Sequence, residues 1–480
     1  MIVGYAIPAV QKFQGAAYKS LYYQALENSK ADGATPDDNP CLIARGDELY
    51  RAGGGAVPSV LIVPQFVKPG AVYTQIPTPT VEAGDFDQFT FTRATTATRV
   101  NASGLIESVA SGLLRLDYPI GGGCPAALIE PSGTNIMAQS ETLSVSGNWS
   151  RVNVLVTGGA IASPDGLASG TLIVATSGSA EHKISRSAAT TVASGAVVTT
   201  SCFFKAHGTN NFAQLVIGGF TFSPINPFAN FNLTGSGSVT TGNYTSAFIQ
   251  DYGNGWYRCG FTVTAAASGT PSTLIVPVVA SGTSRDATFT GDGVNGVYAW
   301  GFQVETGSIP TSYIPTTTGQ ATRNADVCTV SGVSGYIGQT EGTLYAEVQI
   351  NNFTANSRIL AISDGTSNAR VILQEAANSV IQGIVTTASA NVASISTASG
   401  QTAGVYKIAL AYKADDFVMY VNGTQIGTDT GGAVPACSQI FLGKIETSAT
   451  TNQLGDRLRA AAIYTTRLDN NTLANLTRLT

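Results

Sequence analysis

Short strand-like segments separated by turn residues fill most of this 480-residue chain, and they constrain its fold more than any other feature. From about residue 85 to 310 the chain runs through stretches such as TLIVAT, VVTTSCFFKA, FAQLVIGGF and VYAWGFQVETG, bounded by Gly, Ser, Asn or Asp. No segment with helical spacing separates them. Because parallel sheets need crossover helices, the pattern predicts antiparallel β-sandwiches rather than a βαβ sheet.

The first part of the chain has a different character. Residues 9–29, AVQKFQGAAYKSLYYQALENS, carry apolar side chains at helical spacing and predict one helix. The prolines between residues 64 and 79 disfavour a central strand in the segment that follows. We therefore expect residues 1–84 to form a helix and a Pro-rich arm that packs on the following domain or on a neighbouring subunit.

A second β-rich unit follows the linker TSYIPTTTG at residues 311–319. The stretch LYAEVQI at 344–350 alternates apolar and other residues, as a strand does. Asn422-Gly423 lies between two strand patterns and is the strongest hairpin signal in the chain. Near the end of the chain, Asp469 is a good N-cap for a terminal helical turn.

The charge of the chain is low and slightly acidic. Lys, Arg, Asp and Glu make up 11% of the residues, against about 25% in ordinary soluble domains, and 43% are hydrophobic, which argues against disorder. A net charge of −5 leaves no basic surface for nucleic acid. No apolar run reaches the roughly 18 residues of a membrane span, and the start lacks a signal peptide, so synthesis in a cytoplasm without membrane insertion is expected.

Residues for metal or thiol chemistry are sparse. The six cysteines form no C-x-x-C pair, so we expect neither a zinc site nor a disulfide framework but reduced, buried thiols. The only histidines are His182 and His207, which leaves little material for His-based metal sites or catalysis.

Several separated motifs resemble one family. They follow one another along the chain as FTRATTATRVNASGLIESV (91–109), RLDYPIGGGCPAALIEPSGTNIM (115–137), NWSR (148–151), GNGWYRCGFTVTA (253–265) and VYAWGFQVETGSIPTSYIPTTTGQATRNADV (297–327). Together they resemble tailed-bacteriophage virion proteins, which are fibre, tail and head-appendage proteins that share a carbohydrate-binding-like jelly roll. The resemblance covers roughly residues 85–327.

The last third of the chain resembles a laminin-G or concanavalin-A-like sandwich, through EGTLYAEV, FVMYVNG and LRAAAIYTTRLDNNTLANL. The two resemblances imply a mainly β protein, with an N-terminal helix and extended arm before two antiparallel β-sandwiches. The expected domains are a particle-attachment segment at 1–84, a β-hairpin connector at 85–138, a carbohydrate-binding-like jelly roll at 139–327 and a laminin-G/concanavalin-A-like sandwich at 328–480.

Aromatic side chains are the candidate sugar contacts, because sugar rings stack on aromatic rings and polar neighbours bond their hydroxyls. Alternation along WYRCGFTVTA places Trp256 and Arg258 on the face opposite a buried stripe that begins with Tyr257. With Tyr252 and Trp149, these two residues form the candidate carbohydrate-binding set. Packing between domains is the favoured alternative for Trp256 and Arg258.

Trp300 is in phase with Tyr298 and Phe302, which predicts one core stripe. The letters GDGVNG at 291–296 match a dinucleotide motif, but strand patterns flank both sides and a turn is expected. Asp292 and Glu305 are the candidate oxygen ligands of a structural Ca²⁺. Otherwise the sequence predicts no cofactor.

No catalytic motif stands out. The carboxylate pair Asp415-Asp416 and the alternating pair Asp85 and Asp87 have the setting of solvated turns, and no G-x-S-x-G, Walker or H-E-x-x-H sequence occurs. Glu181-His182-Lys183 and Arg186 form a small charged cluster that is expected on a solvated face. The prediction is therefore that the chain is not an enzyme.

These observations and the resemblance lead to one functional prediction. The chain is expected to be a structural component of a phage virion, a homotrimeric fibre or appendage held to other virion proteins by residues 1–84. Its sandwiches would then contact host-surface glycans. The alternatives are a head-decorating or tail-structural protein without a ligand and, less favoured, a polysaccharide depolymerase.

Overall fold

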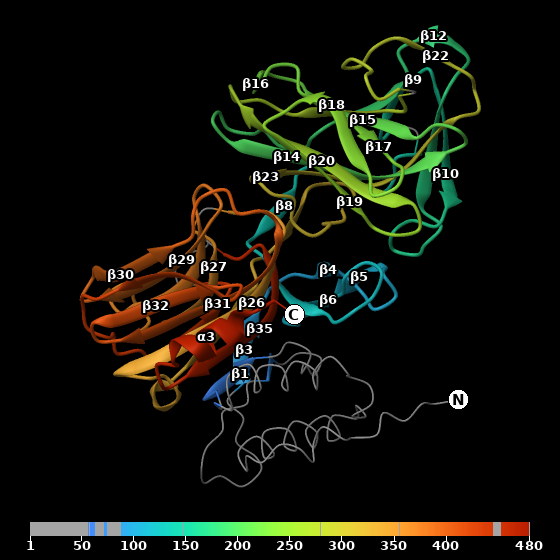
Figure 1. Ribbon diagram of the computed structural model, residues 1–480. Helices are drawn as coiled ribbons and strands as arrows, with labels where there is room; N and C mark the ends of the chain where they lie inside the picture. Colours follow the sequence, from blue (N-terminus) through green and yellow to red (C-terminus); the bar gives the residue numbers. More distant parts are fainter. Residues whose placement is uncertain are drawn as a thin grey trace, which may run out of the picture.

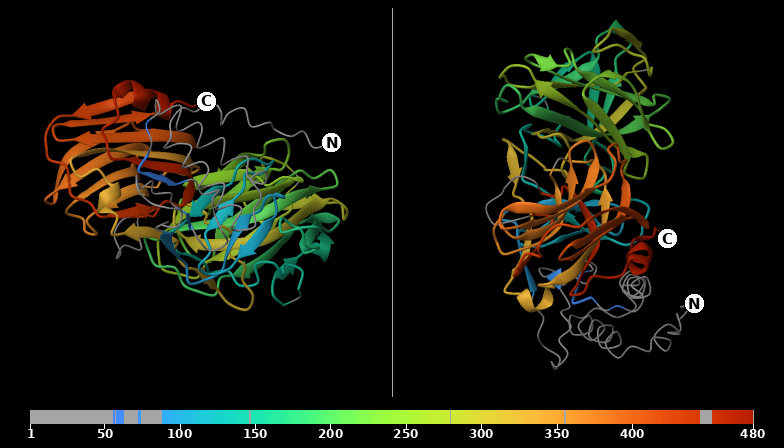
Figure 2. Two further views of the ribbon diagram at one scale, coloured as in Figure 1. Left: turned by 90° about the horizontal axis from the view of Figure 1, so that it is seen from below. Right: turned by 60° about the vertical axis from the view of Figure 1, so that its left-hand side comes forward.

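The computed structural model describes residues 56, 58–62, 72–73 and 88–479, except 146, 279, 355 and 445–452. Two β-sandwiches make up most of this part of the chain (Figures 1 and 2), and the prediction of a mainly β protein built from antiparallel sandwiches is confirmed. The helix expected at 9–29 and most of the Pro-rich arm lie outside the described residues.

The central sandwich packs a seven-stranded sheet on a six-stranded sheet, counted among the described residues, and all its strand pairs are antiparallel. The larger sheet contains β10 (Val154–Ile161), β11 (Gly170–Ala175), β14 (Val197–His207), β16 (Phe222–Ser223), β19 (Ser246–Asp251), β20 (Trp256–Ala265) and β23 (Gly296–Thr306). The smaller sheet contains β9 (Ser150–Val152), β13 (Lys183–Ser187), β15 (Phe212–Gly218), β17 (Phe228–Asn232), β18 (Ser238–Asn243) and β21 (Ser272–Val276).

Alternation along β20 places its buried stripe in the core of this sandwich, as predicted: Tyr257, Cys259, Phe261 and Val263 all belong to the same apolar cluster. Successive side chains of a strand point to opposite faces, so the other residues of β20 face away from this core. One of them, Trp256, belongs to a separate aromatic cluster against Ile106.

The predicted single stripe on β23 is wrong. Trp300 belongs to the outer aromatic cluster, whereas Phe302 lies in the sandwich core. Between them, Gly301 has φ +64°, and the pairing of β14 with β23 shifts register at this point. A β-bulge adds one residue to a strand, so the alternation changes face at Gly301.

The C-terminal sandwich packs two sheets of eight strands each within the described residues, again with antiparallel pairing. One sheet contains β1 (Val60–Ile62), β6 (Arg115–Asp117), β7 (Ala126–Ile129), β26 (Glu341–Ile350), β31 (Gly404–Lys413), β32 (Asp416–Val421), β33 (Thr424–Asp429) and β35 (Asp456–Tyr464). The other contains β2 (Val72–Tyr73), β3 (Gln88–Thr92), β25 (Val327–Ser331), β27 (Arg358–Ser363), β28 (Arg370–Ala376), β29 (Val380–Thr387), β30 (Ala390–Ser396) and β34 (Gln439–Leu442).

Segments from both sides of the central sandwich therefore build the C-terminal one. The chain enters the central sandwich after β8 (Gly133–Asn135) and returns through β24 (Ala321–Arg323), and these two strands pair with each other. The central sandwich is thus an insertion between strands of the C-terminal sandwich.

Smaller elements complete the described chain. They are the hairpin of β4 (Ala97–Val100) and β5 (Ile106–Val109), the pair β12 (Gly178–Ala180) and β22 (Phe289–Gly291), the 3₁₀ turn η4 (Ser334–Tyr336) and the helix α3 (Asn470–Thr477). None of the helices described is long and apolar enough to cross a membrane.

Local signals near the C-terminus are confirmed. Asn422 and Gly423 have φ of 49° and 83° and connect β32 to β33, as expected for a two-residue hairpin loop. The carboxylate of Asp469 accepts hydrogen bonds from the backbone N–H groups of Asn471 and Thr472 and caps α3. The helix packs through Leu473 and Leu476 on the outer face of the sheet.

One expectation about the cysteines is wrong, because Cys124 is disulfide-bonded. The other described cysteines, Cys202, Cys259, Cys328 and Cys437, are free and buried as predicted.

Candidate functional site

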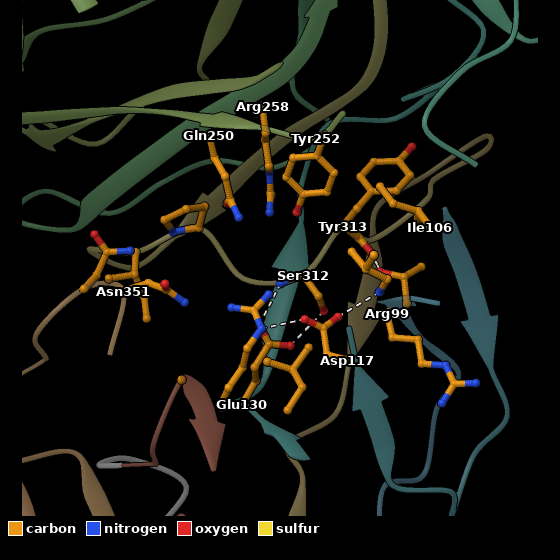
Figure 3. A pocket seen from close by; sticks show the side chains of 18 of the residues that line it. Arg99, Ile106, Asp117, Glu130, Gln250, Tyr252, Arg258, Ser312, Tyr313 and Asn351 are labelled. Carbon is orange, nitrogen blue, oxygen red and sulfur yellow. Dashed lines mark hydrogen bonds and ion pairs between the residues drawn. The ribbon is translucent and has the colours of Figure 1, made fainter. Parts of the chain in front are cut away.

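A cavity of about 270 Å³ lies where the two sandwiches meet (Figure 3). This is close to the lower end of the roughly 300–1,000 Å³ typical of small-molecule pockets. Its lining comes from β19, β20 and the 309–313 segment of the central sandwich, from β4 and β6, and from β7, β35 and the segment after β26. The principal polar residues of this lining are Arg99, Asp117, Glu130, Gln250, Tyr252, Arg258, Ser312, Asn351, Asn352 and Arg457.

The central sandwich supplies the upper wall. Figure 3 shows Gln250 of β19, Arg258 of β20 and Tyr252, in the turn between these strands, pointing toward the opposite wall. Gln250 is exposed and Tyr252 half-buried, whereas Arg258 is only 4% exposed. Burial raises the pKa of Tyr252, so the phenol keeps its proton near neutral pH. This wall thus offers an amide, a hydroxyl and an aromatic ring.

Arg258 is held in place from behind. Its Nη1 donates to the carbonyl of Thr311 at 2.8 Å, and its guanidinium lies 5.5 Å from the centre of the Phe203 ring. A guanidinium over an aromatic face is stabilised by the ring quadrupole. A cation fixed in this way can meet a ligand with little further loss of side-chain freedom.

An ion pair forms the opposite wall. Arg457 Nε donates to Asp117 Oδ2 at 2.5 Å, and Asp117 Oδ1 accepts from the backbone N–H of Val100 at 2.7 Å. Burial alone would lower the pKa of Arg457, but the adjacent Asp117 outweighs it and raises that pKa. The arginine therefore stays charged.

Below this wall lies a buried charge network, defined here as Arg93, Arg115, Glu130, Arg323 and Asp326. Each of these residues is at most 3% exposed. Arg93 contacts Asp326 at 2.9 Å, Arg115 contacts Glu130 at 2.7 Å, and Arg115 also pairs with Asp326. Arg323 lies within 4 Å of both carboxylates. Buried charges need such partners, because an unpaired ion is costly in a low-dielectric interior.

Glu130 links the network to the central sandwich. Its carboxylate accepts hydrogen bonds from the backbone N–H and the hydroxyl of Ser312, both at 2.7 Å. Burial raises the pKa of Glu130, but Arg323, Arg115 and the Ser312 hydrogen bonds outweigh it and lower the pKa to about 2. Nearby, the Thr98 hydroxyl donates to the carbonyl of Tyr313 at 2.5 Å. These contacts fix one sandwich against the other, so the cavity is preformed.

The structure separates the four predicted sugar contacts into two pairs. Tyr252 and Arg258 lie together in the cavity wall. Trp256 is 2% exposed and donates from Nε1 to the carbonyl of Ala162, and Trp149 is 1% exposed and packs edge-on against Phe302. Neither tryptophan presents a ring face to solvent. Trp256 instead takes the packing role named as its alternative.

The two predicted calcium ligands are not brought together. Asp292 is exposed and accepts from the backbone N–H groups of Val294 and Asn295, whereas Glu305 is buried and accepts from Thr311. Nearly all of β23 lies between them, which at about 3.3 Å per residue corresponds to roughly 30 Å. In the described part of the chain, no three His, Cys, Asp or Glu side chains are arranged to hold a metal ion.

Sequence reasoning missed most of the cavity wall. Asp117 belongs to the motif RLDYP, which resembles phage proteins but carries no site signal of its own, and its partner Arg457 lies 340 positions away. Gln250 and Asn352 stand next to turns and carry no distinctive pattern. An acidic residue buried in a short strand was the one available signal, since such a residue needs a partner.

No family model and no curated protein matches the chain. Among solved structures it is similar to the CBM40 of the Ruminococcus gnavus IT-sialidase bound to α2,3-sialyllactose, with 14% identity, 30% of this chain and 84% of that chain covered, and a TM-score of 0.27. A second similar structure belongs to botulinum neurotoxin type C, whose cell entry depends on interaction with two ganglioside molecules. It has 15% identity, 32% of this chain and 40% of that chain covered, and a TM-score of 0.26.

The prediction that the chain is not an enzyme is contradicted by this comparison. The NanB sialidase from Streptococcus pneumoniae is also among the similar structures, with 11% identity, 30% of this chain and 26% of that chain covered, and a TM-score of 0.24.

Proposed function

We propose that this chain is a carbohydrate-binding adhesion protein whose ligand occupies the cavity between the two sandwiches. The observation that carries the proposal is the composition of that cavity. Tyr252 supplies a ring for the apolar face of a sugar, and the exposed amides of Gln250 and Asn352 supply hydrogen bonds for its polar groups. A volume of about 270 Å³ suits a short sugar rather than a long stretch of polysaccharide.

The preformed geometry supports this role. Hydrogen bonds from Ser312 to Glu130 and from Thr98 to the carbonyl of Tyr313 connect the two walls. Ligand binding therefore does not require the sandwiches to be ordered first. A rigid site loses less conformational entropy on binding than a mobile one.

We further propose that the protein is a bacteriophage virion component, attached through residues 1–84, assembled as a homotrimer and displaying the sandwiches toward host glycans. The motifs that resemble phage fibre and appendage proteins support this assignment, as does the low charge, which favours dense packing of subunits. Imaging of intact particles with a labelled copy of the chain tests it. A chain that is absent from particles would contradict the virion role without touching the carbohydrate role.

A glycan array tests the carbohydrate role. The full chain is expected to bind a limited set of glycans. Tyr252→Ala is expected to weaken that binding at least about tenfold, because the buried apolar contact of an aromatic ring contributes on the order of 1.5–3 kcal/mol. Val294→Ala, an exposed position in the turn before β23, is the control and should bind as the unmodified chain does. A blank array would contradict the proposal.

A further inference from the structure

The carboxylates of the cavity are already occupied by partners from the protein. Asp117 accepts from Arg457 and from the backbone of Val100, and Glu130 accepts from Ser312, Arg115 and Arg323. Ionised carboxylates offer only acceptors. The acceptor capacity of these two groups is therefore directed into the protein rather than toward a ligand.

The hydrogen-bond donors of the cavity are less fully used. A guanidinium carries five N–H donors, and within the described residues Asp117 is the only acid that pairs with Arg457, through Nε. The side chain of Arg457 is 22% exposed. On the facing wall, Arg258 donates from Nη1 to the carbonyl of Thr311 and from Nη2 to the hydroxyl of Ser201, and its buried Nε has no hydrogen-bond partner among the described residues. Gln250 and Asn352 add exposed amides at the rim.

Arg99 does not belong to this donor set, although it lines the cavity. Its Nε donates to Glu107 at 2.7 Å, and Figure 3 shows its guanidinium turned away from the other labelled side chains. The two arginines that remain, Arg258 and Arg457, come from different sandwiches and face the same space.

We propose that the cavity selects anionic sugars, with the acidic group, a carboxylate or a sulfate ester, held between Arg258 and Arg457. This inference rests on the proposed carbohydrate-binding function and names its ligand class. Guanidinium groups bind such oxyanions through charge-assisted, often bidentate hydrogen bonds, which are roughly twice as strong as neutral ones. A neutral sugar leaves these donors without the charged acceptor that they favour.

The test uses the full chain on an array that carries uronic-acid, sialylated, sulfated and neutral glycans, followed by calorimetry with matched pairs. Methyl β-glucuronoside and methyl β-glucoside differ only in the carboxylate, and a sulfated and an unsulfated galactoside separate sulfate from carboxylate recognition. We expect the acidic member to bind at least about tenfold more tightly, which corresponds to one charge-assisted contact.

The double variant Asp117→Asn/Arg457→Gln removes both charges of the lower wall while keeping a hydrogen-bonding pair. It should lose the preference for acidic sugars by about tenfold and change the affinity for neutral sugars little. Arg151→Gln removes the same kind of charge from an exposed position on β9 and should leave both affinities unchanged. If the double variant does not fold, Gln250→Ala tests the upper rim, where we expect a loss of about threefold for acidic sugars.

The outcomes separate the two proposals. Equal or tighter binding of neutral sugars would overturn the anionic preference and leave the carbohydrate role standing. Binding of no glycan would overturn both. A preference for acidic sugars that survives in the folded double variant would place the anionic contact elsewhere on the molecule and overturn the site assigned to it.

Discussion

Arg93 and Asp326 lie 233 positions apart in the sequence, and their side chains form a fully buried ion pair at 2.9 Å. Asp326 also pairs with Arg115 and accepts from the backbone N–H of Glu130. One carboxylate therefore holds two arginines and a strand end at the junction of the sandwiches.

Replacing this carboxylate should be costly. Asp326→Asn leaves two buried guanidinium groups without their shared charge, and we expect a loss of about 3–5 kcal/mol in the free energy of unfolding. The measurement is urea denaturation followed by tryptophan fluorescence. Glu107→Gln, in the partly exposed pair with Arg99, is the control and should cost less than about 1 kcal/mol. Equal effects of the two substitutions would contradict a stabilising role for the network.

The free energy of unfolding should depend on pH in opposite directions at two glutamates, Glu130 and Glu375. The folded-state pKa of Glu130 is lowered to about 2, so its stabilising contribution is present above about pH 4 and is lost as the pH falls through 2. Burial raises the pKa of Glu375 to about 9, so its contribution is present below about pH 4 and is lost as the pH rises through 9.

The same substitution at both sites separates these effects. Glu375→Gln, which resembles the protonated acid, should gain stability over the unmodified chain by up to about 1.4 kcal/mol per pH unit between pH 5 and 8. Glu130→Gln should be destabilised at neutral pH by roughly 3 kcal/mol and approach the unmodified chain toward pH 2. Thermal melts across this range provide the measurement. Parallel pH profiles would show that the two environments do not differ as described.

The bulge in β23 requires glycine. Gly301 has φ +64°, and a Cβ there would lie 2.9 Å from the Phe203 ring. Gly301→Ala should therefore lower the free energy of unfolding by about 2–4 kcal/mol, because it adds both backbone strain and overpacking. Gly104 has φ +77° but open space around it, so Gly104→Ala should cost only the backbone share of about 1–2 kcal/mol. Melting temperatures that fall by the same amount would show that the contact with Phe203 is unimportant.

Trp256 and Gln250 should respond in opposite ways. Trp256 is buried and donates to Ala162, so Trp256→Phe is expected to reduce stability by about 1–3 kcal/mol while changing glycan affinity less than about twofold. Gln250→Ala, at an exposed cavity position, should leave stability within about 0.5 kcal/mol and weaken binding. Calorimetry and thermal melts on both variants measure this. A large loss of affinity in the folded Trp256→Phe protein would show that Trp256 contacts the ligand.

The part of the fold that depends on neighbours in sequence could be predicted. The Asn422-Gly423 hairpin and the Asp469 cap follow from local backbone preferences, and the buried stripe of β20 follows from alternation. The placement of Trp300 could not be predicted in this way, because the bulge at Gly301 reverses the faces of the strand and leaves no mark in the alternation.

The candidate site was harder to predict than the strands. Asp117 and Arg457 meet only because the first and last parts of the chain build one sheet. Trp149 and Trp256 are aromatic residues in a carbohydrate-binding-like chain, but the same size that suits a sugar also makes them effective core residues. Residue type alone does not separate these roles, whereas burial in the folded chain does.

The pairing of β8 with β24 has an evolutionary consequence. Asn135 and Ala321 are partners across these strands, so the two connections of the central sandwich lie side by side. A domain whose ends lie next to each other can be exchanged for another without rerouting the chain that carries it. The architecture therefore allows recombination to exchange the central sandwich, and with it one wall of the binding cavity. The C-terminal sandwich that supports it can meanwhile be inherited unchanged.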